Sequence, residues 1–171
     1  MSLNFSRESP KELVFESVAE YLHSKHLKIH TEDSSRPWGG FFVLEENESD
    51  KFIELYFSHL TKEALTIAGK LSPKILIVAP NQRLSWQFHH RRAEIWKLIG
   101  GTAGVVTSDT DEEKETVHLK IGDIIQLKQG ERHRLIGLEG WGIVAEIWRH
   151  TDENNPSDEA DIVRLQDDFG R

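Results

Sequence analysis

The chain has 171 residues, of which 37% are hydrophobic and 29% charged, which suits one globular domain with a sizeable core. Its formal net charge of −8 argues against a broad nucleic-acid surface, although a local basic site for a small anion is compatible with it. The absence of cysteine excludes disulfides and thiolate metal ligands. No apolar run has the length of a membrane span, and the first residues lack the apolar core of a signal peptide. We therefore expect a cytoplasmic protein with neither a membrane nor a nucleic-acid partner.

The first part of the chain is helix-prone. Apolar residues recur at helical spacing over 10–26, which predicts a helix there. A short strand is expected over 27–31, followed by a polar loop. A second helix is expected over 50–60, because apolar residues such as Phe52 and Tyr56 share one helical face.

From residue 74 onward the pattern predicts β structure. Seven or eight short apolar runs alternate with turn signals, and there is no βαβ rhythm. The runs are KILIVAP, RLSWQFHH, AEIWKLIGG, AGVVTSD, TVHLK, DIIQLKQG, HRLIGL and GIVAEIW. We therefore expect a mostly β sandwich or barrel, with the polar segment TSDTDEEKETV as a solvated hairpin turn.

Four metal donors are predicted within this β region. Alternate residues of a strand share a face, so Gln87 and His89 point the same way. A turn at 91–93 would return Glu94 on an adjacent strand, at the end of a hairpin. His133 begins another strand after a turn and can supply a fourth donor from across the barrel.

These donor types suit one divalent metal ion, because imidazole nitrogen and carboxylate oxygen bind borderline divalent cations. Zinc is the first expectation, with iron, manganese or nickel as alternatives. A lone histidine in a β-rich chain is more often structural than a ligand, so the prediction depends on the joint pattern. His90 is the rival ligand, because a β-bulge could turn it inward.

The spacing of the donors resembles the two sequence motifs of the cupin superfamily. The positions that match the first motif are Asn81, Gln87, His89, Glu94 and Gly101. Those that match the second are Gly122, Lys128, Gly130, His133 and Gly137. Asparagine can replace the family's glycine because it also tolerates a positive φ, and the amide oxygen of glutamine replaces an imidazole as a weaker donor. The resemblance implies a cupin double-stranded β-helix, or jelly-roll barrel.

We expect a single cupin domain over 1–171. A helical N-terminal extension would occupy 1–33, and the barrel would occupy 34–171, with one helical insertion at about 50–65. Cupins often pair through barrel edges, so the resemblance also implies a homodimer.

Four motifs give a narrower resemblance, to the type II phosphomannose isomerase branch of the cupins. They are RPWGGF from Arg36, RLSWQFHHRRAEIW from Arg83, RHRL from Arg132 and DIVRLQDDFGR from Asp161. This branch occurs alone or as the C-terminal part of mannose-1-phosphate guanylyltransferases. The resemblance implies metal-dependent interconversion of an aldose phosphate and a ketose phosphate, of the mannose 6-phosphate and fructose 6-phosphate type.

Basic residues near the donors are predicted to hold the sugar phosphate. Substrate-binding roles are expected for Arg83, Arg91 and Arg134. Catalytic roles are expected for Arg92, Arg171 and Glu131. The proton-transferring base is left open between Glu131, His90 and Glu146.

Two other functions are compatible with the sequence. One is a non-catalytic, metal-containing cupin that binds a sugar or sugar phosphate. This function is favoured by Gln87, which stands where the cupin motif has a histidine. The other is an isomerase or epimerase of a neutral sugar. Binding of a phosphorylated ligand and turnover are the properties that separate the three.

Overall fold

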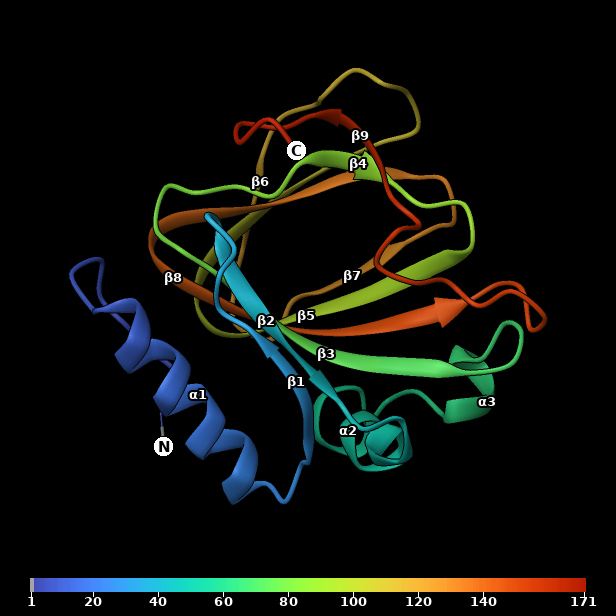
Figure 1. Ribbon diagram of the computed structural model, residues 1–171, viewed down its shortest axis with the longest axis horizontal. Coiled ribbons are helices and arrows are strands. Elements are labelled where there is room, and N and C mark those ends of the chain that lie inside the picture. The colour runs from blue at the N-terminus through green and yellow to red at the C-terminus, as the bar shows by residue number, and fades with distance from the viewer. Residues whose placement is uncertain (1) are drawn as a thin grey trace.

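Residues 2–171 are described by the computed structural model, in which nine antiparallel strands form one continuous sheet that curls into a barrel (Figure 1). The strands are β1 Ile29–Asp33, β2 Gly39–Leu44, β3 Leu71–Val78, β4 Trp86–Phe88, β5 Arg92–Ser108, β6 Val117–Leu119, β7 Ile124–Leu127, β8 Arg132–His150 and β9 Val163–Gln166. The helices are α1 Lys11–Ser24, the 3₁₀ turn η1 Glu46–Glu48, α2 Ser49–Tyr56 and α3 Lys62–Leu65. The mostly β jelly-roll barrel with an N-terminal helix and a helical insertion is confirmed.

Two long, bent strands connect the two sides of the barrel. β5 has 17 residues and β8 has 19, and they pair with each other along most of their length. The prediction of separate short strands here is wrong, because the glycines interpreted as turns lie inside the strands. Gly101 adopts φ +66° at a register shift, and a Cβ there would lie 1.7 Å from the carbonyl oxygen of Trp141. A bulge with close backbone contact therefore bends the strand where a turn was expected.

β4 lies between β8 and β9 and does not pair with β5. The predicted hairpin between the strand of Gln87 and the strand of Glu94 is therefore wrong. The two residues still line the same cavity, because β8, with which both strands pair, bends round the barrel (Figure 1). Gln87 is the register partner of His133 in the first half of β8, and Glu94 is the partner of Trp148 in the second half.

The sheet separates two hydrophobic clusters. On β3, Ile75 and Ile77 pack outward against the helices, whereas Leu76 and Val78 pack into the barrel. This explains why all eight residues of β3 are buried. The outer cluster includes the buried face of α1, close to the predicted position, and the buried face of α2, which ends earlier than expected. No helix within residues 2–171 is long and apolar enough to cross a membrane.

Candidate metal centre

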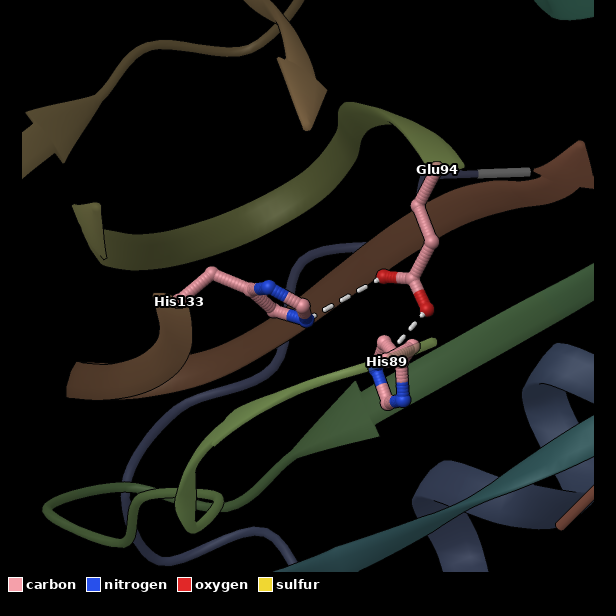
Figure 2. Close-up of side chains that lie close together, drawn as sticks. All are labelled: His89, Glu94 and His133. Carbon is pink, nitrogen blue, oxygen red and sulfur yellow. Dashed lines mark ion pairs between the residues drawn. The ribbon is translucent and has the colours of Figure 1, made fainter. Parts of the chain in front are cut away.

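Three buried side chains from separate segments converge inside the barrel (Figure 2). His89 follows β4, Glu94 lies on β5 and His133 lies on β8. Glu94 Oε1 is 3.2 Å from His89 Nε2, and Glu94 Oε2 is 3.4 Å from His133 Nε2. One potential ligand atom from each residue lies within 4.8 Å of the others. The structure thus brings together three of the four predicted donors.

Backbone carbonyls fix both imidazole rings in the orientation that a metal ligand needs. His89 Nδ1 donates a hydrogen bond to the Asp161 carbonyl at 2.6 Å, and His133 Nδ1 donates to the Glu131 carbonyl at 2.9 Å. In each neutral ring the Nε2 atom is then the free acceptor, and it faces the other donors.

Two of the donor atoms lack hydrogen-bond partners. Within residues 2–171, Glu94 Oε2 and His133 Nε2 are fully buried and accept no hydrogen bond. A buried polar atom left unpaired costs about 1–3 kcal/mol. A divalent cation would compensate for this loss, so the two imidazole nitrogens and one carboxylate fit the predicted metal ion.

The protonation states also suit metal binding. Burial lowers the pKa of His89 to about 3, so its ring is neutral near neutral pH. Burial raises the pKa of Glu94, but the imidazole of His89 and the permanent positive charge of Arg92 beside it hold the pKa well below its usual range. The centre therefore contains an ionised carboxylate, which is the form that coordinates metals.

Arg92 is a buried cation beside the centre. Its Nε donates to Glu94 Oε1 at 2.7 Å, and its Nη2 lies 3.1 Å from His89 Nε2. Its Nη1 donates to Ser157 Oγ at 2.8 Å, and the guanidinium lies 3.6 Å from the Trp148 ring. A metal ion at the centre would use the lone pair of His89 Nε2, so Arg92 would then keep its contacts to Glu94 and Ser157.

The other two predicted ligands lie differently. Gln87 is buried beside the cluster, where its Oε1 accepts a hydrogen bond from Ser85 Oγ at 2.5 Å and its Nε2 is 3.5 Å from His89 Nε2. Rotating the amide by half a turn would direct Oε1 toward the cluster, so its role as a ligand stays a prediction. His90 is exposed and packs edge-on against Phe88, away from the cluster.

A cavity of about 100 Å³ adjoins the centre. Its lining includes the catalytic candidates Arg92 and Arg171 together with Lys74 and Glu146. Glu146 accepts a hydrogen bond from Trp96 Nε1 at 2.8 Å. Burial, reinforced by the negative charge of Glu94, raises the pKa of Glu146 to about 8.

The remaining predicted residues lie outside the lining of this cavity. Arg83 pairs with a carboxylate at 2.6 Å, Arg91 at 3.2 Å and Arg134 at 2.6 Å. The Glu131 carboxylate accepts a hydrogen bond from the backbone N–H of Lys128 at 2.7 Å. The binding and catalytic roles of these four residues stay predictions.

Residues 47–167 match the family described as mannose-6-phosphate isomerase C-terminal. The chain belongs to this family. The matched segment contains all three residues of the buried cluster and both long strands.

Curated relatives include an alginate biosynthesis protein and a mannose-1-phosphate guanylyltransferase. The alginate biosynthesis protein AlgA of Pseudomonas aeruginosa is 29% identical over 73% of this chain and 24% of its own length. The mannose-1-phosphate guanylyltransferase ManC of Salmonella typhimurium is 25% identical over 94% of this chain and 27% of its own length. The chain thus spans about a quarter of the length of these relatives.

Solved structures support the fold alone. Vicilin from Corylus avellana matches with a TM-score of 0.53 and 16% identity, over 81% of this chain and 36% of that one. An oxalate oxidase in complex with glycolate matches with a TM-score of 0.52 and 16% identity, over 78% of this chain and 58% of that one. This family member is therefore a cupin barrel related to sugar-phosphate enzymes.

Proposed function

We propose that the protein is a metal-dependent isomerase that interconverts an aldose phosphate and a ketose phosphate, of the mannose 6-phosphate and fructose 6-phosphate type. The observation that carries this proposal is the buried cluster of His89, Glu94 and His133, with two unpaired donor atoms, beside a cavity lined by a carboxyl group. The family description supports the same reaction class.

A divalent ion bound by the cluster would supply Lewis acidity at the sugar carbonyl. The chain itself must move a proton between the two adjacent carbons. Among the base candidates, Glu146 lines the cavity, whereas Glu131 and His90 do not. Its pKa of about 8 lies close to neutral pH, where a group can both remove and return a proton.

Trp96 orients the carboxyl group of Glu146, and Lys74 places a positive charge near it. Trp96 Nε1 donates to Glu146 Oε1, which fixes the orientation of the carboxyl. Lys74 is only 4% exposed, and its ammonium lies 3.7 Å from the Trp148 ring, so it adds a buried positive charge to the same wall. That charge stabilises the ionised form of Glu146 and so opposes part of the effect of burial.

The test is turnover by the metal-loaded protein, followed as equilibration of mannose 6-phosphate and fructose 6-phosphate. Glu146→Gln should lower kcat by at least about 100-fold, because it removes the proton carrier. The variant should bind as much metal as the wild type, since Glu146 is not part of the cluster. Glu20→Gln, on the exposed face of α1, is the matched control and should change neither property. Full activity in Glu146→Gln would contradict this assignment.

A second candidate is a protein that binds a sugar or sugar phosphate around its metal without turnover. It is favoured by Arg92, whose guanidinium contacts donor atoms of both His89 and Glu94. Binding of mannose 6-phosphate without turnover under zinc, iron, manganese and nickel would favour this candidate. An isomerase of a neutral sugar would instead convert unphosphorylated mannose at least as well as mannose 6-phosphate.

A further inference from the structure

Three arginines that lie far apart in the sequence line the cavity where it opens to solvent, here called its mouth, because each of their side chains is partly exposed. Arg36 lies in the loop between β1 and β2, Arg164 lies on β9 and Arg171 is the last residue of the chain. They belong to the RPWG, DIVR and GR segments of the sequence, none of which supplies a residue of the His89, Glu94 and His133 cluster. A cluster of cations is notable in a chain with a net charge of −8.

Much of the hydrogen-bonding capacity of these guanidinium groups is free. Within residues 2–171, Arg164 makes no side-chain hydrogen bond or ion pair, so its N–H donors have no protein partner. Arg36 donates through Nε to Asp33 at 2.8 Å, and Arg171 donates through Nε and Nη2 to Asp167 at 2.9 Å. The two carboxylates hold the guanidinium groups of Arg36 and Arg171 in place, and the remaining N–H groups can bind another ligand.

Strand pairing sets the direction and the reach of Arg164. Gln87 is the register partner of His133 on β8 and of Arg164 on β9. Directly paired residues project from the same face of a sheet, so Arg164 projects toward the side where Gln87 meets the cluster. Two strand spacings of about 4.8 Å place its Cα about 10 Å from that of His133.

Carboxylates pair with two of the three arginines, which leaves the charge of Arg164 without an ion-pair partner within residues 2–171. Partial burial and the like charges of Arg171 and Arg36 lower the pKa of Arg164, although the carboxylates of Asp167 and Glu159 oppose them. The carboxylate of Glu159 also lines the cavity, but it forms an ion pair with Lys74. A dianionic ligand would relieve the repulsion among the three guanidinium groups.

We propose that Arg36, Arg164 and Arg171 bind the phosphate of the sugar-phosphate substrate. This inference rests on the proposed function and names the binding residues of the same site. A hexose 6-phosphate carries its phosphate at the opposite end of the carbon chain from C1 and C2. With the phosphate at the mouth, the carbonyl end of the sugar extends inward along the paired residues Arg164, Gln87 and His133 toward the metal centre. Arg83, Arg91 and Arg134 pair with carboxylates outside the lining of the cavity, so this contact does not require them.

The test is calorimetric titration of the zinc-loaded full chain with mannose 6-phosphate and, separately, with inorganic phosphate. Arg164→Gln should weaken binding of both probes by about 10- to 100-fold, because it removes charge-assisted hydrogen bonds. Arg164→Lys should retain part of the affinity, since it keeps the charge but loses the fork. Arg7→Gln, at an exposed position in the N-terminal segment, is the control and should bind both probes like the wild type. Unchanged circular dichroism and zinc content exclude misfolding of the variants.

Wild-type affinity for both probes in Arg164→Gln would overturn the inference. It would also be overturned if the wild type bound mannose as tightly as mannose 6-phosphate, or if Arg83→Gln lost the affinity while Arg164→Gln kept it. Loss of phosphate binding in Arg164→Gln together with no turnover in the wild type would support the anion site and defeat the isomerase proposal. The two proposals can therefore fail separately.

Discussion

Asp161 connects the loop after β8 to the histidine ligand that follows β4. Its carboxylate accepts hydrogen bonds from the backbone N–H groups of His90 and Arg91, each at 3.0 Å, and from Ser157 Oγ at 2.6 Å. Its own carbonyl accepts the Nδ1–H of His89 at 2.6 Å. One buried residue thus fixes both the backbone of the ligand loop and the tautomer of the ligand.

The Asp161→Asn substitution keeps the shape of the side chain but replaces one accepting oxygen with an NH₂ group. At least one of the three donors then loses its acceptor, and the others lose the charge that strengthens them. Hydrogen bonds to charged groups contribute about 1.5–3 kcal/mol each, so the free energy of unfolding should fall by about 2–4 kcal/mol. Because the loop that orients His89 is loosened, zinc affinity should fall by about 10- to 100-fold.

The effect on stability should depend on pH. Burial raises the pKa of Asp161, but the hydrogen bonds from Ser157, His90 and Arg91 outweigh it and lower the pKa below its ordinary value of 3.8. The stabilisation is therefore complete above that value and is lost as the pH falls through the pKa of the folded state. The difference between wild type and variant should shrink accordingly at acidic pH.

The assay is urea unfolding of the metal-free protein, followed by tryptophan fluorescence, with zinc affinity measured against a competing chelator. Asp109→Asn, at an exposed position in the loop between β5 and β6, is the control and should change neither quantity. The reasoning is refuted if Asp161→Asn stays within about 0.5 kcal/mol of the wild type in stability and keeps its zinc affinity.

Two further predictions concern stability. Gly101→Ala should lower the free energy of unfolding by more than about 2 kcal/mol, because its Cβ would overlap the Trp141 carbonyl at a positive φ. Gly122→Ala, with no neighbour within 4 Å of the added Cβ, should cost only about 1 kcal/mol, and equal losses in urea unfolding would contradict this contrast. Burial lowers the pKa of His150 to about 4, so the unfolded chain binds that proton first and stability should fall as pH drops from about 6.5 to about 4. His150→Gln should reduce this slope, and urea midpoints at pH 7, 5.5 and 4.5 that fall equally in both proteins would count against it.

The donor spacing predicted the cluster, although the expected route was different. His89, Glu94 and His133 were identified from local register, and local register is what the strands preserve. The hairpin that should have joined them does not exist, because pairing with β8 is a long-range property. For the same reason the sequence predicts AEIWKLIGG and AGVVTSD as two short strands, whereas Gly101 lies at a bulge inside one long strand.

The arginines show a second limit of the sequence. The positions of Arg83, Arg91 and Arg134 near the donors in sequence predict phosphate contacts, but each forms an ion pair with a carboxylate outside the cavity lining. Arg36 and Arg164 reach the mouth through the β1–β2 loop and the pairing of β9. The available signal was their position in the RPWG and DIVR motifs. The homodimer stays a prediction.

The central claim is that His89 and His133, with Glu94, hold one divalent metal ion. The most direct test is metal analysis of the purified wild type and of the His89→Ala/His133→Ala double variant. The wild type should hold about one equivalent of metal per chain, and the folded double variant should hold almost none. His90→Ala, at the exposed neighbour, should retain the metal. Stoichiometric metal in the folded double variant would contradict the account.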